Sequence, residues 1–315
     1  MSDITIQNFE AELIQASMQQ PVLLDIWAPW CGPCKTLGPL LDKVEAAYAG
    51  RFKLSKLNSD DQPEIAAQLS QAFGVRSIPF CVMFKDGQPV DGFVGALPEA
   101  QIREFLDRHV PTAEAVQAED QADEAEALEA DGDVDAALAK LQQAVAIDPA
   151  NEAARYDYIK LLIETGQGAQ ARNAWQPVAS KAIVDGRIAA LGLWLDAGDK
   201  ATTARAPEVL AAAIETNRRD FDARYELAQI AFAQGRFTDA MDALLEIVMR
   251  DKAWNGELAR KTYVAILTVM SKPVPKPAAG AEPAKGALEV VGRTTVASSD
   301  PVIDQYRRKL SMALF

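Results

Sequence analysis

Residues 25–35 read DIWAPWCGPCK, and this stretch contains two of the three cysteines in the 315-residue chain. The apolar run at 21–28 favours a strand, and apolar residues at helical spacing follow from Cys34 to about residue 50. Cys31 therefore lies where a strand ends and a helix begins, at a position where free amides and the helix dipole stabilise a thiolate. Cys34 follows one turn later, close enough to attack a mixed disulfide on Cys31. The pair predicts thiol–disulfide exchange.

The neighbours of the cysteine pair fit this chemistry. Gly32 permits a tight start to the helix, and Pro33 suits the first turn, where no amide hydrogen bond is lost. Trp30 would flank the nucleophile and offer an apolar surface. We expect Gly32, Pro33 and Trp30 to contribute to a surface that contacts client proteins.

Two other interpretations of the cysteines remain open. A CxxC pair can be half of a zinc site, but the remaining candidate ligands are Cys81 and His109, without a second CxxC or a His pair. The pair can also be a relic whose chemistry has lapsed. Cys81 lies in the apolar run FCVMF and is predicted to be a small core residue. We expect no metal and no organic cofactor.

Composition restricts the partners and the compartment. The formal charge of −13 argues against non-specific binding to nucleic acid or to an anionic membrane surface. The N-terminal stretch has no basic region followed by an apolar run, and no apolar stretch is as long as a membrane span. We therefore expect a cytoplasmic protein, in a reducing compartment where a Cys pair is more often redox-active than structural.

Residues 1–110 alternate between strand and helix patterns. Further strands are predicted at 52–58 and in a hairpin at 79–95 around an Asp-Gly turn, and further helices at 63–74 and 97–110. The order β-α-β-α-β-β-α predicts an α/β fold with a mixed sheet and helices on both faces.

This region resembles thioredoxin throughout. The resemblance rests on DIWAPWCGPCK, KLNSDD, FGVRSIPF and VGALPEAQIREFLD. It implies that Cys31 is the nucleophile, Cys34 the resolving thiol and Pro79 a cis-proline facing them. It also implies that Asp25 is a buried carboxylate below the pair with Lys56 as its neighbour, and that Ile78 and Gly95 complete the client-binding lip. A buried acid near Cys34 could act as its proton acceptor, since burial raises the pKa of a carboxyl group.

The remainder of the chain has a helical-repeat pattern. Residues 111–135 carry ten acidic residues and no Lys or Arg, and we expect a linker at 111–117. Gly132, Gly166, Gly198 and Gly235 recur at spacings of 34, 32 and 37, each predicted to separate two helices. This pattern resembles tetratricopeptide (TPR) repeats and predicts about four helical hairpins over 118–271, of which the middle ones are irregular.

The C-terminal end contains two further segments. Residues 272–299 are rich in Pro, Ala and Gly without periodicity and are predicted to be a flexible linker. Residues 300–315 have apolar side chains at helical spacing beside a basic trio. This amphipathic helix either caps the last repeat or docks on a partner. The predicted docking residues are Tyr306, Arg307, Arg308, Leu310, Leu314 and Phe315.

A thioredoxin domain followed by degenerate TPR repeats and a terminal helix resembles the bacterial chaperedoxin family (CnoX/YbbN). The resemblance implies a co-chaperone that holds unfolding or oxidised clients, protects their cysteines through mixed disulfides and passes them to the chaperonin GroEL. Two alternatives remain: a general protein-disulfide reductase that is recharged by a thioredoxin reductase, and a TPR scaffold that uses its thioredoxin domain for docking.

Overall fold

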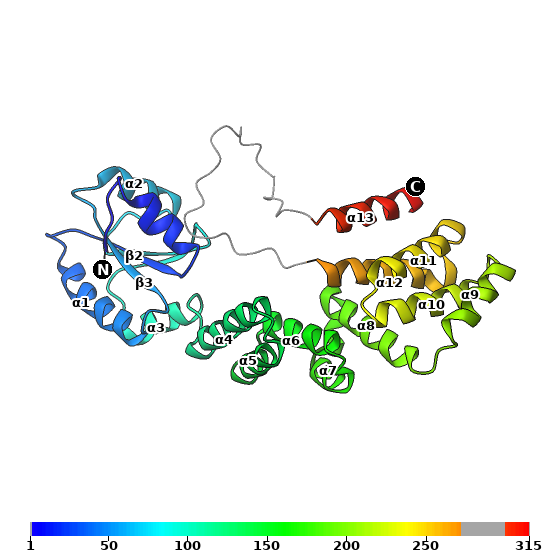
Figure 1. Ribbon diagram of the computed structural model, residues 1–315. Coiled ribbons are helices and arrows are strands. Elements are labelled where there is room, and N and C mark those ends of the chain that lie inside the picture. The colour runs from blue at the N-terminus through cyan, green and yellow to red at the C-terminus, as the bar shows by residue number, and fades with distance from the viewer. Residues whose placement is uncertain (1, 272–299, 315) are drawn as a thin grey trace. The chain divides into compact units, whose positions relative to one another are not determined.

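The computed structural model describes residues 2–271 and 300–314, which form two compact units (Figure 1). One unit extends to Val116, and the other begins at Gln117 and includes the C-terminal helix. The predicted flexible linker at 272–299 and the predicted docking residue Phe315 lie outside the described residues. Within the described part of the chain, every helix is too short or too polar to cross a membrane.

The first unit contains a five-stranded sheet with the strand order β1-β3-β2-β4-β5. β1 and β2 each run parallel to β3, whereas β4 runs antiparallel to β2 and to β5. The sheet is therefore mixed, as predicted. The strands are β1 (Ser2–Asp3), β2 (Val22–Trp27), β3 (Lys53–Asn58), β4 (Phe80–Lys85) and β5 (Gln88–Val94).

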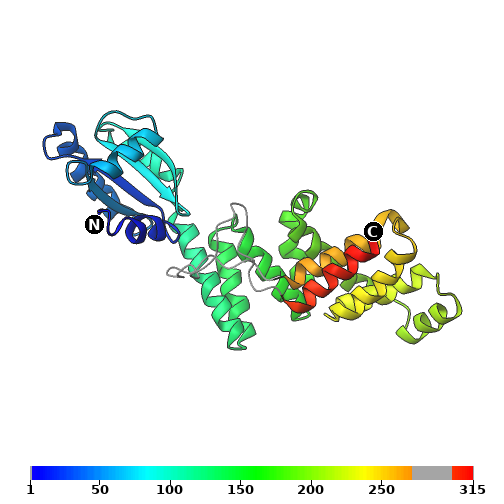
Figure 2. The same ribbon diagram turned by 90° about the horizontal axis from the view of Figure 1, so that it is seen from above.

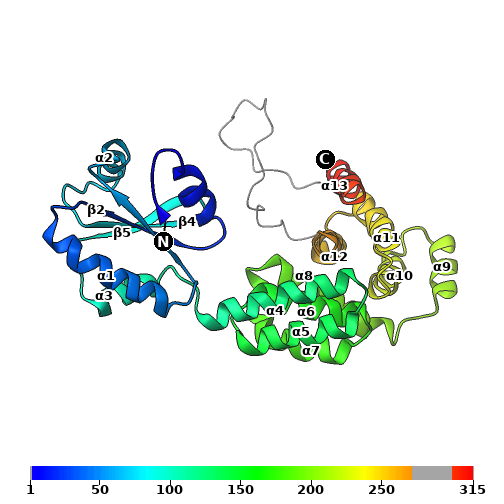
Figure 3. The ribbon, with the colours of Figure 1, turned by 60° about the vertical axis from the view of Figure 1, so that its left-hand side comes forward.

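Helices cover both faces of this sheet, with α1 and α3 on one side and α2 on the other (Figure 3). The central strand β2 is buried on both faces: Leu23 belongs to the core cluster under α1 and α3, whereas Val22 and Leu24 belong to the opposite one. This alternation explains the unbroken apolar run in the sequence. The helices are the π-helix η1 (Glu10–Gln15), α1 (Gly32–Ala47), α2 (Pro63–Ala72) and α3 (Glu99–Asp107).

Local sequence patterns did not predict the first two elements, β1 and η1. β1 has two residues, too few for a periodic pattern, and it joins the sheet by pairing Ser2 and Asp3 with β3. η1 packs Leu13 into the core cluster that includes α2. β1 depends on pairing with a distant strand and η1 on packing in the core, so local periodicity does not reveal them.

The second unit is all-helical. Its elements are α4 (Ala113–Ala130), which crosses the boundary between the units, α5 (Val134–Ile147), α6 (Glu152–Glu164), α7 (Gly168–Trp175), the 3₁₀ helix η2 (Gln176–Ile183), α8 (Gly186–Ala201), α9 (Pro207–Thr216), α10 (Phe221–Ala233), α11 (Phe237–Arg250), α12 (Trp254–Met270) and α13 (Pro301–Leu314).

Three of the four predicted glycine turns occur in the structure. Gly132, Gly166 and Gly235 each separate two helices and have φ of 85°, 75° and 70°, which an L side chain rarely adopts. The prediction for Gly198 was wrong, because α8 continues through it to Ala201. The buried apolar side chains of α8 extend up to Gly198, where the neighbouring Ala197 is fully buried.

The predicted linker at 111–117 is also corrected, because α4 begins at Ala113. The hydroxyl of Thr112 accepts a hydrogen bond of 3.1 Å from the amide of Ala115, as an N-cap does. The alanine-rich sequence that follows has a high helix propensity, so the helix starts where a linker was expected.

Small and aromatic side chains hold the helical core together. Ala228 and Ala240 are fully buried on α10 and α11, as expected for helices that approach closely. Trp194 on α8 stacks on Phe232 with 5.7 Å between ring centroids, and its indole N–H donates to the Phe232 carbonyl at 2.8 Å. The aromatic pair joins two repeats through packing and a satisfied polar group.

We predict that Gly192→Ala destabilises this unit. A methyl group at residue 192 would lie 2.8 Å from Cζ2 of Trp175, whose ring is held by a 3.0 Å hydrogen bond to the Ile188 carbonyl. We expect a loss of about 1–2 kcal/mol from overpacking, read as a lower midpoint of thermal unfolding by circular dichroism.

The matched control is Gly198→Ala on the same helix, where the added methyl meets nothing within 4 Å. This change should stabilise the protein by about 0.5–1 kcal/mol through helix propensity. Equal stabilisation by both substitutions would contradict the tight contact between Gly192 and Trp175.

Candidate functional site

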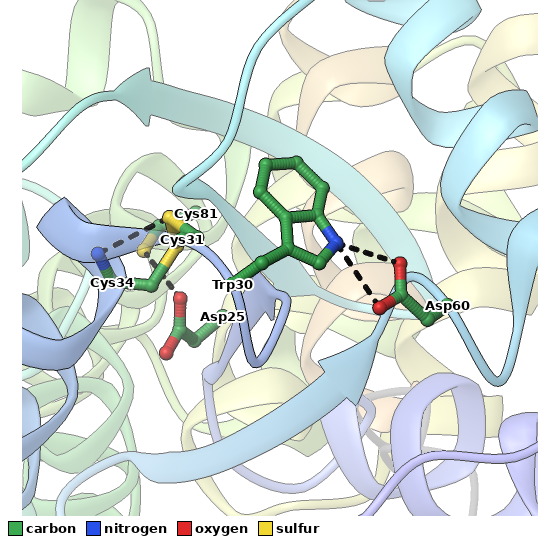
Figure 4. Close-up of a disulfide and its surroundings, with 6 residues drawn as sticks. All are labelled: Asp25, Trp30, Cys31, Cys34, Asp60 and Cys81. Atoms are coloured by element: carbon green, nitrogen blue, oxygen red, sulfur yellow. Dashed lines mark hydrogen bonds between the residues drawn. A yellow bond between two sulfur atoms is a disulfide. The ribbon is translucent and has the colours of Figure 1, made fainter.

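The two cysteines of the CxxC motif are joined by a disulfide at the start of α1, with 5.3 Å between their Cα atoms (Figure 4). Cys31 is the N-cap residue, and its sulfur accepts a hydrogen bond of 3.2 Å from the Cys34 amide. Pro33 lies within the first turn and Gly32 begins the helix, as their residue types suggest. The Cys31 sulfur therefore occupies the position where a helix N-terminus stabilises negative charge.

The disulfide lies at the edge of the core. Cys31 and Cys34 are 4 % and 5 % exposed, and they pack with Ala28, Trp27 and Ile78. The intervening residues Gly32 and Pro33 are exposed, so the loop between the cysteines faces solvent. A client could reach the pair from this side.

Trp30 is the most exposed aromatic residue near the pair, at 70 %. Its indole N–H donates to both carboxylate oxygens of Asp60, at 3.2 and 3.1 Å, and Figure 4 shows the ring standing beside the cysteines. The ring offers an apolar face, and the exposed, bifurcated hydrogen bond to Asp60 restrains its position. Asp60 was not among the predicted site residues, because an acidic residue in a polar loop gives no local signal.

The loop before β4 completes the surface around the pair. The peptide bond between Ile78 and Pro79 is cis, as the thioredoxin resemblance implied. Pro79 is buried, and its carbonyl accepts a 2.8 Å hydrogen bond from the amide of Gly95. Gly95 has a φ of 87°, in the left-handed region that favours glycine. Ile78 packs on the disulfide, and the hydrogen bond joins Pro79 to Gly95. Ile78, Pro79 and Gly95 therefore lie close together beside the cysteine pair.

Asp25 is a buried acid in the middle of β2, only 2 % exposed. Its cross-strand neighbours are Lys56 on β3 and Cys81 on β4, and Figure 4 shows its carboxylate pointing toward the cysteine sulfurs. Burial raises the pKa of Asp25 from 3.8 to about 6, although the Lys56 charge and a hydrogen bond from Cys81 act in the opposite direction. A carboxyl group with this pKa can accept and release a proton near neutral pH.

Lys56 has a second carboxylate neighbour. Its ammonium group forms an ion pair of 2.7 Å with Asp42 on α1. The side chain of Lys56 is 15 % exposed, so its positive charge is shared between an acid at the surface and the buried Asp25. This arrangement explains why a charge is tolerated beside the core.

Cys81 has a contact that its apolar surroundings did not predict. It is fully buried and belongs to the core cluster of Leu23 and Met83, in agreement with a small core residue. In addition, its sulfur lies 3.8 Å from Oδ1 of Asp25 as a hydrogen-bond donor. Only the antiparallel register of β2 and β4 brings these two residues together.

Except for Phe315, which lies outside the described residues, the predicted docking residues lie on α13, which packs beside α11 and α12 (Figures 1 and 2). Ile303, Tyr306 and Leu310 are buried there. The Tyr306 hydroxyl donates to Asp242 at 3.0 Å, and the Tyr263 hydroxyl donates to the Tyr306 carbonyl at 2.8 Å. These contacts fit the capping interpretation of the helix.

The other residues of α13 have different surroundings. Arg307, Arg308 and Met312 are exposed, whereas Leu314 is partly buried and its carbonyl accepts a 2.6 Å hydrogen bond from Lys252. A partner could therefore contact the basic face of α13 while the apolar face remains packed.

Residues 1–108 match the family profile described as Thioredoxin, and residues 128–191 and 200–277 match two profiles described as Tetratricopeptide repeat. The chain thus has a thioredoxin domain followed by TPR repeats, as predicted.

Curated relatives match the first of these regions. Over 107 residues the chain is 42 % identical to Thioredoxin 1 of Synechococcus elongatus. The aligned region covers 34 % of this chain and 94 % of that protein. Over 111 residues it is 43 % identical to Thioredoxin of Haemophilus influenzae, covering 35 % of this chain and all of that protein. Thioredoxin 2 of Chlorobaculum tepidum is 42 % identical over 108 residues, or 34 % of this chain and 94 % of that protein.

We predict that Asp25→Asn stabilises the oxidised protein at about pH 8 and leaves its stability unchanged at about pH 4. Because the folded pKa is raised from 3.8 to about 6, the native state binds the proton more tightly than the unfolded state, so stability falls as pH rises through this range. The difference corresponds to at most about 3 kcal/mol. We expect about 1–3 kcal/mol at the higher pH.

Calorimetry on the full chain would measure this effect. The transition to follow is the one whose midpoint changes when the disulfide is reduced, because that transition reports unfolding of the unit that contains Cys31 and Cys34. The control is Glu104→Gln, which neutralises an exposed acid on α3 and should change stability by less than about 0.5 kcal/mol. A stabilisation that is equal at both pH values would contradict the link to Asp25 ionisation.

Proposed function

Because the chain belongs to the thioredoxin family through its N-terminal domain, we propose that it exchanges thiols and disulfides with protein clients. The observation that carries the proposal is the Cys31–Cys34 disulfide at the N-terminus of α1, with the buried Asp25 carboxylate directed toward it. The oxidised pair would be returned to dithiol by an external reductase of the thioredoxin reductase type.

In the proposed reaction, the Cys31 thiolate attacks a client disulfide, and the first client sulfur leaves as a thiolate. The S–H of Cys34 then gives its proton to the Asp25 carboxylate. The Cys34 thiolate attacks the Cys31 sulfur, so the intramolecular disulfide forms and the second client sulfur leaves. Asp25 returns the proton to the departing thiolate or to water, and the client has gained two electrons.

The surface around the pair is suited to an extended peptide. Trp30 offers an exposed ring, and Ile78 and Gly95 flank the buried cis-proline. Pro79 has no amide hydrogen, and the amide of Gly95 is already bonded to its carbonyl, so the local backbone is held without a client. We propose that clients lie across these residues with their sulfur next to Cys31.

We further propose that the protein is a co-chaperone of the chaperedoxin type. Thioredoxin chemistry needs only residues 1–110, whereas the TPR region at 118–271 supplies a large surface of the kind that binds proteins. In this proposal the helical unit holds unfolding or oxidised clients, the cysteine pair reduces or protects their thiols, and the segment 300–315 hands the complex to the chaperonin GroEL in the cytoplasm.

We propose that docking uses only one face of α13. Tyr306 and Leu310 are buried against α11 and α12, so contact through them would require the helix to leave its site. Arg307 and Arg308 are exposed, and their positive charges contrast with the net charge of −13 of the whole chain. We assign the partner contact to this basic face.

We predict that Cys34→Ala traps clients as mixed disulfides, because Cys31 can attack but no second thiol resolves the product. Tagged full-length protein would be purified from cells and eluted first without and then with a reductant. Many proteins released only by the reductant would support exchange on cellular clients. Cys31→Ser with Cys34→Ala should trap none and is the control, and Cys31→Ser alone should reduce insulin no faster than the uncatalysed reaction.

If unfolded proteins and the chaperonin elute from Cys34→Ala without reductant and nothing more elutes with it, the exchange proposal is contradicted. If clients are trapped but the variant Cys31→Ser with Cys34→Ala does not prevent their aggregation, the holding role is contradicted. A general disulfide reductase would then be the better description.

We predict that Arg308→Glu with Met312→Ser lowers the co-purification of GroEL at least about fivefold, because it reverses one charge and removes the most exposed apolar side chain of α13, 74 % exposed. Circular dichroism would check that the helix is retained. The control is Arg218→Glu, which reverses an exposed charge in the loop before α10. Unchanged co-purification by the double variant would rule out docking through this face.

A further inference from the structure

The third thiol of the thioredoxin domain, Cys81, is placed against the carboxylate of Asp25. It is fully buried on β4, and it faces Asp25 across the antiparallel pair of β4 and β2. The distance from its sulfur to Oδ1 is 3.8 Å, with the sulfur as donor. Burial and the neighbouring carboxylate raise the pKa of Cys81 well above its usual value, so the group stays a thiol and keeps its hydrogen.

The charged and titratable groups around Asp25 come from three elements. Lys56 on β3 lies opposite it and carries a positive charge, part of which Asp42 on α1 balances at 2.7 Å. The Cys31–Cys34 pair at the start of α1 is the group toward which the carboxylate points. Among the described residues, Cys81 is the side chain that donates a hydrogen bond to this carboxylate. Lys56 acts on it through its charge.

We propose that Cys81 is a positioning residue, whose S–H donates to Oδ1 of Asp25 and holds the carboxylate turned toward the cysteine pair to receive the Cys34 proton. This role rests on the proposed exchange reaction. Cys81 gains and loses no atom: the proton moves from the Cys34 sulfur to Asp25, the new bond joins Cys34 to Cys31, and the bond between Cys31 and the client sulfur breaks.

A thiol at residue 81 serves this purpose in a way that an aliphatic residue does not. The neighbours of Cys81 in its cluster, such as Leu23 and Met83, are apolar, so packing alone would accept valine there. A valine could not donate, and the carboxylate would then be buried without a hydrogen-bonded partner, which disfavours its charged form. The S–H bond is weak, so the effect on Asp25 is a moderate one.

The test is the titration of the Asp25 carboxyl carbon by NMR in the oxidised full-length protein, with Asp25→Asn used to assign the signal. Cys81→Val and Cys81→Ala should each raise the proton affinity of Asp25 about threefold or more, the size expected for loss of a weak hydrogen bond. Cys81→Ser retains a donor and should restore the wild-type titration or lower the proton affinity. Val82→Ala, on the opposite face of β4, is the control and should leave the titration unchanged.

A second measurement connects the titration to the reaction. The reduced protein would be mixed with a small aromatic disulfide, and the rate at which the Cys31–Cys34 disulfide closes in a single turnover would be measured against pH. In Cys81→Val, the midpoint of this rate profile should move to higher pH by the same amount as the midpoint of the Asp25 titration. Cys81→Ser should move it back.

Two results would overturn the inference. One is an unchanged Asp25 titration in both Cys81→Val and Cys81→Ala when circular dichroism shows both to be folded. The other is a shifted titration without any change in the profile for closure. If the titration shifts but the wild-type protein itself fails to exchange disulfides, the proposed function is contradicted, while the contact between Cys81 and Asp25 is still supported.

Discussion

The hydrogen bond from the Cys34 amide to the Cys31 sulfur connects the fold of the first unit with its chemistry. It requires that β2 end and α1 begin within a few residues, so that a side chain at residue 31 meets the unpaired amides of the first turn. The burial of β2 on both faces holds the strand in place. A displacement of this strand would move the sulfur away from the helix terminus and Asp25 away from the cysteine pair.

The buried carboxylate shows how stability and chemistry oppose each other at this site. Asp25 lies among the buried apolar residues of β2, and its pKa of about 6 reflects the cost of keeping its charge away from water. Lys56 and Cys81 offset part of this cost from the two neighbouring strands. The result is a group that can change its protonation near neutral pH, as a proton acceptor for a thiol requires.

The helical unit depends on a different constraint, the close packing of neighbouring hairpins. Buried alanines join α10 to α11, and the stacked pair of Trp194 and Phe232 joins α8 to α10. α13 extends the same core with Tyr306 over α11 and α12. Because α13 contributes to this core, its apolar face has a structural role, and its exposed basic face is the one that we propose for a partner contact. The same helix can therefore cap the repeats and carry a recognition surface.

Local patterns in the sequence were sufficient for the CxxC turn and for the turns at Gly132, Gly166 and Gly235, because each depends on residues that are neighbours along the chain. The order of strand and helix patterns was sufficient for the mixed sheet. These patterns did not locate β1, the start of α4 or the continuation of α8 through Gly198, where pairing, capping or packing outweighed the local signal. The thioredoxin resemblance implied Lys56 as a neighbour of Asp25, but only the tertiary structure decided that Cys81 meets Asp25 as well. Cys81 is 56 residues away along the chain, and no spacing rule connects the two, because their contact depends on the register of two antiparallel strands.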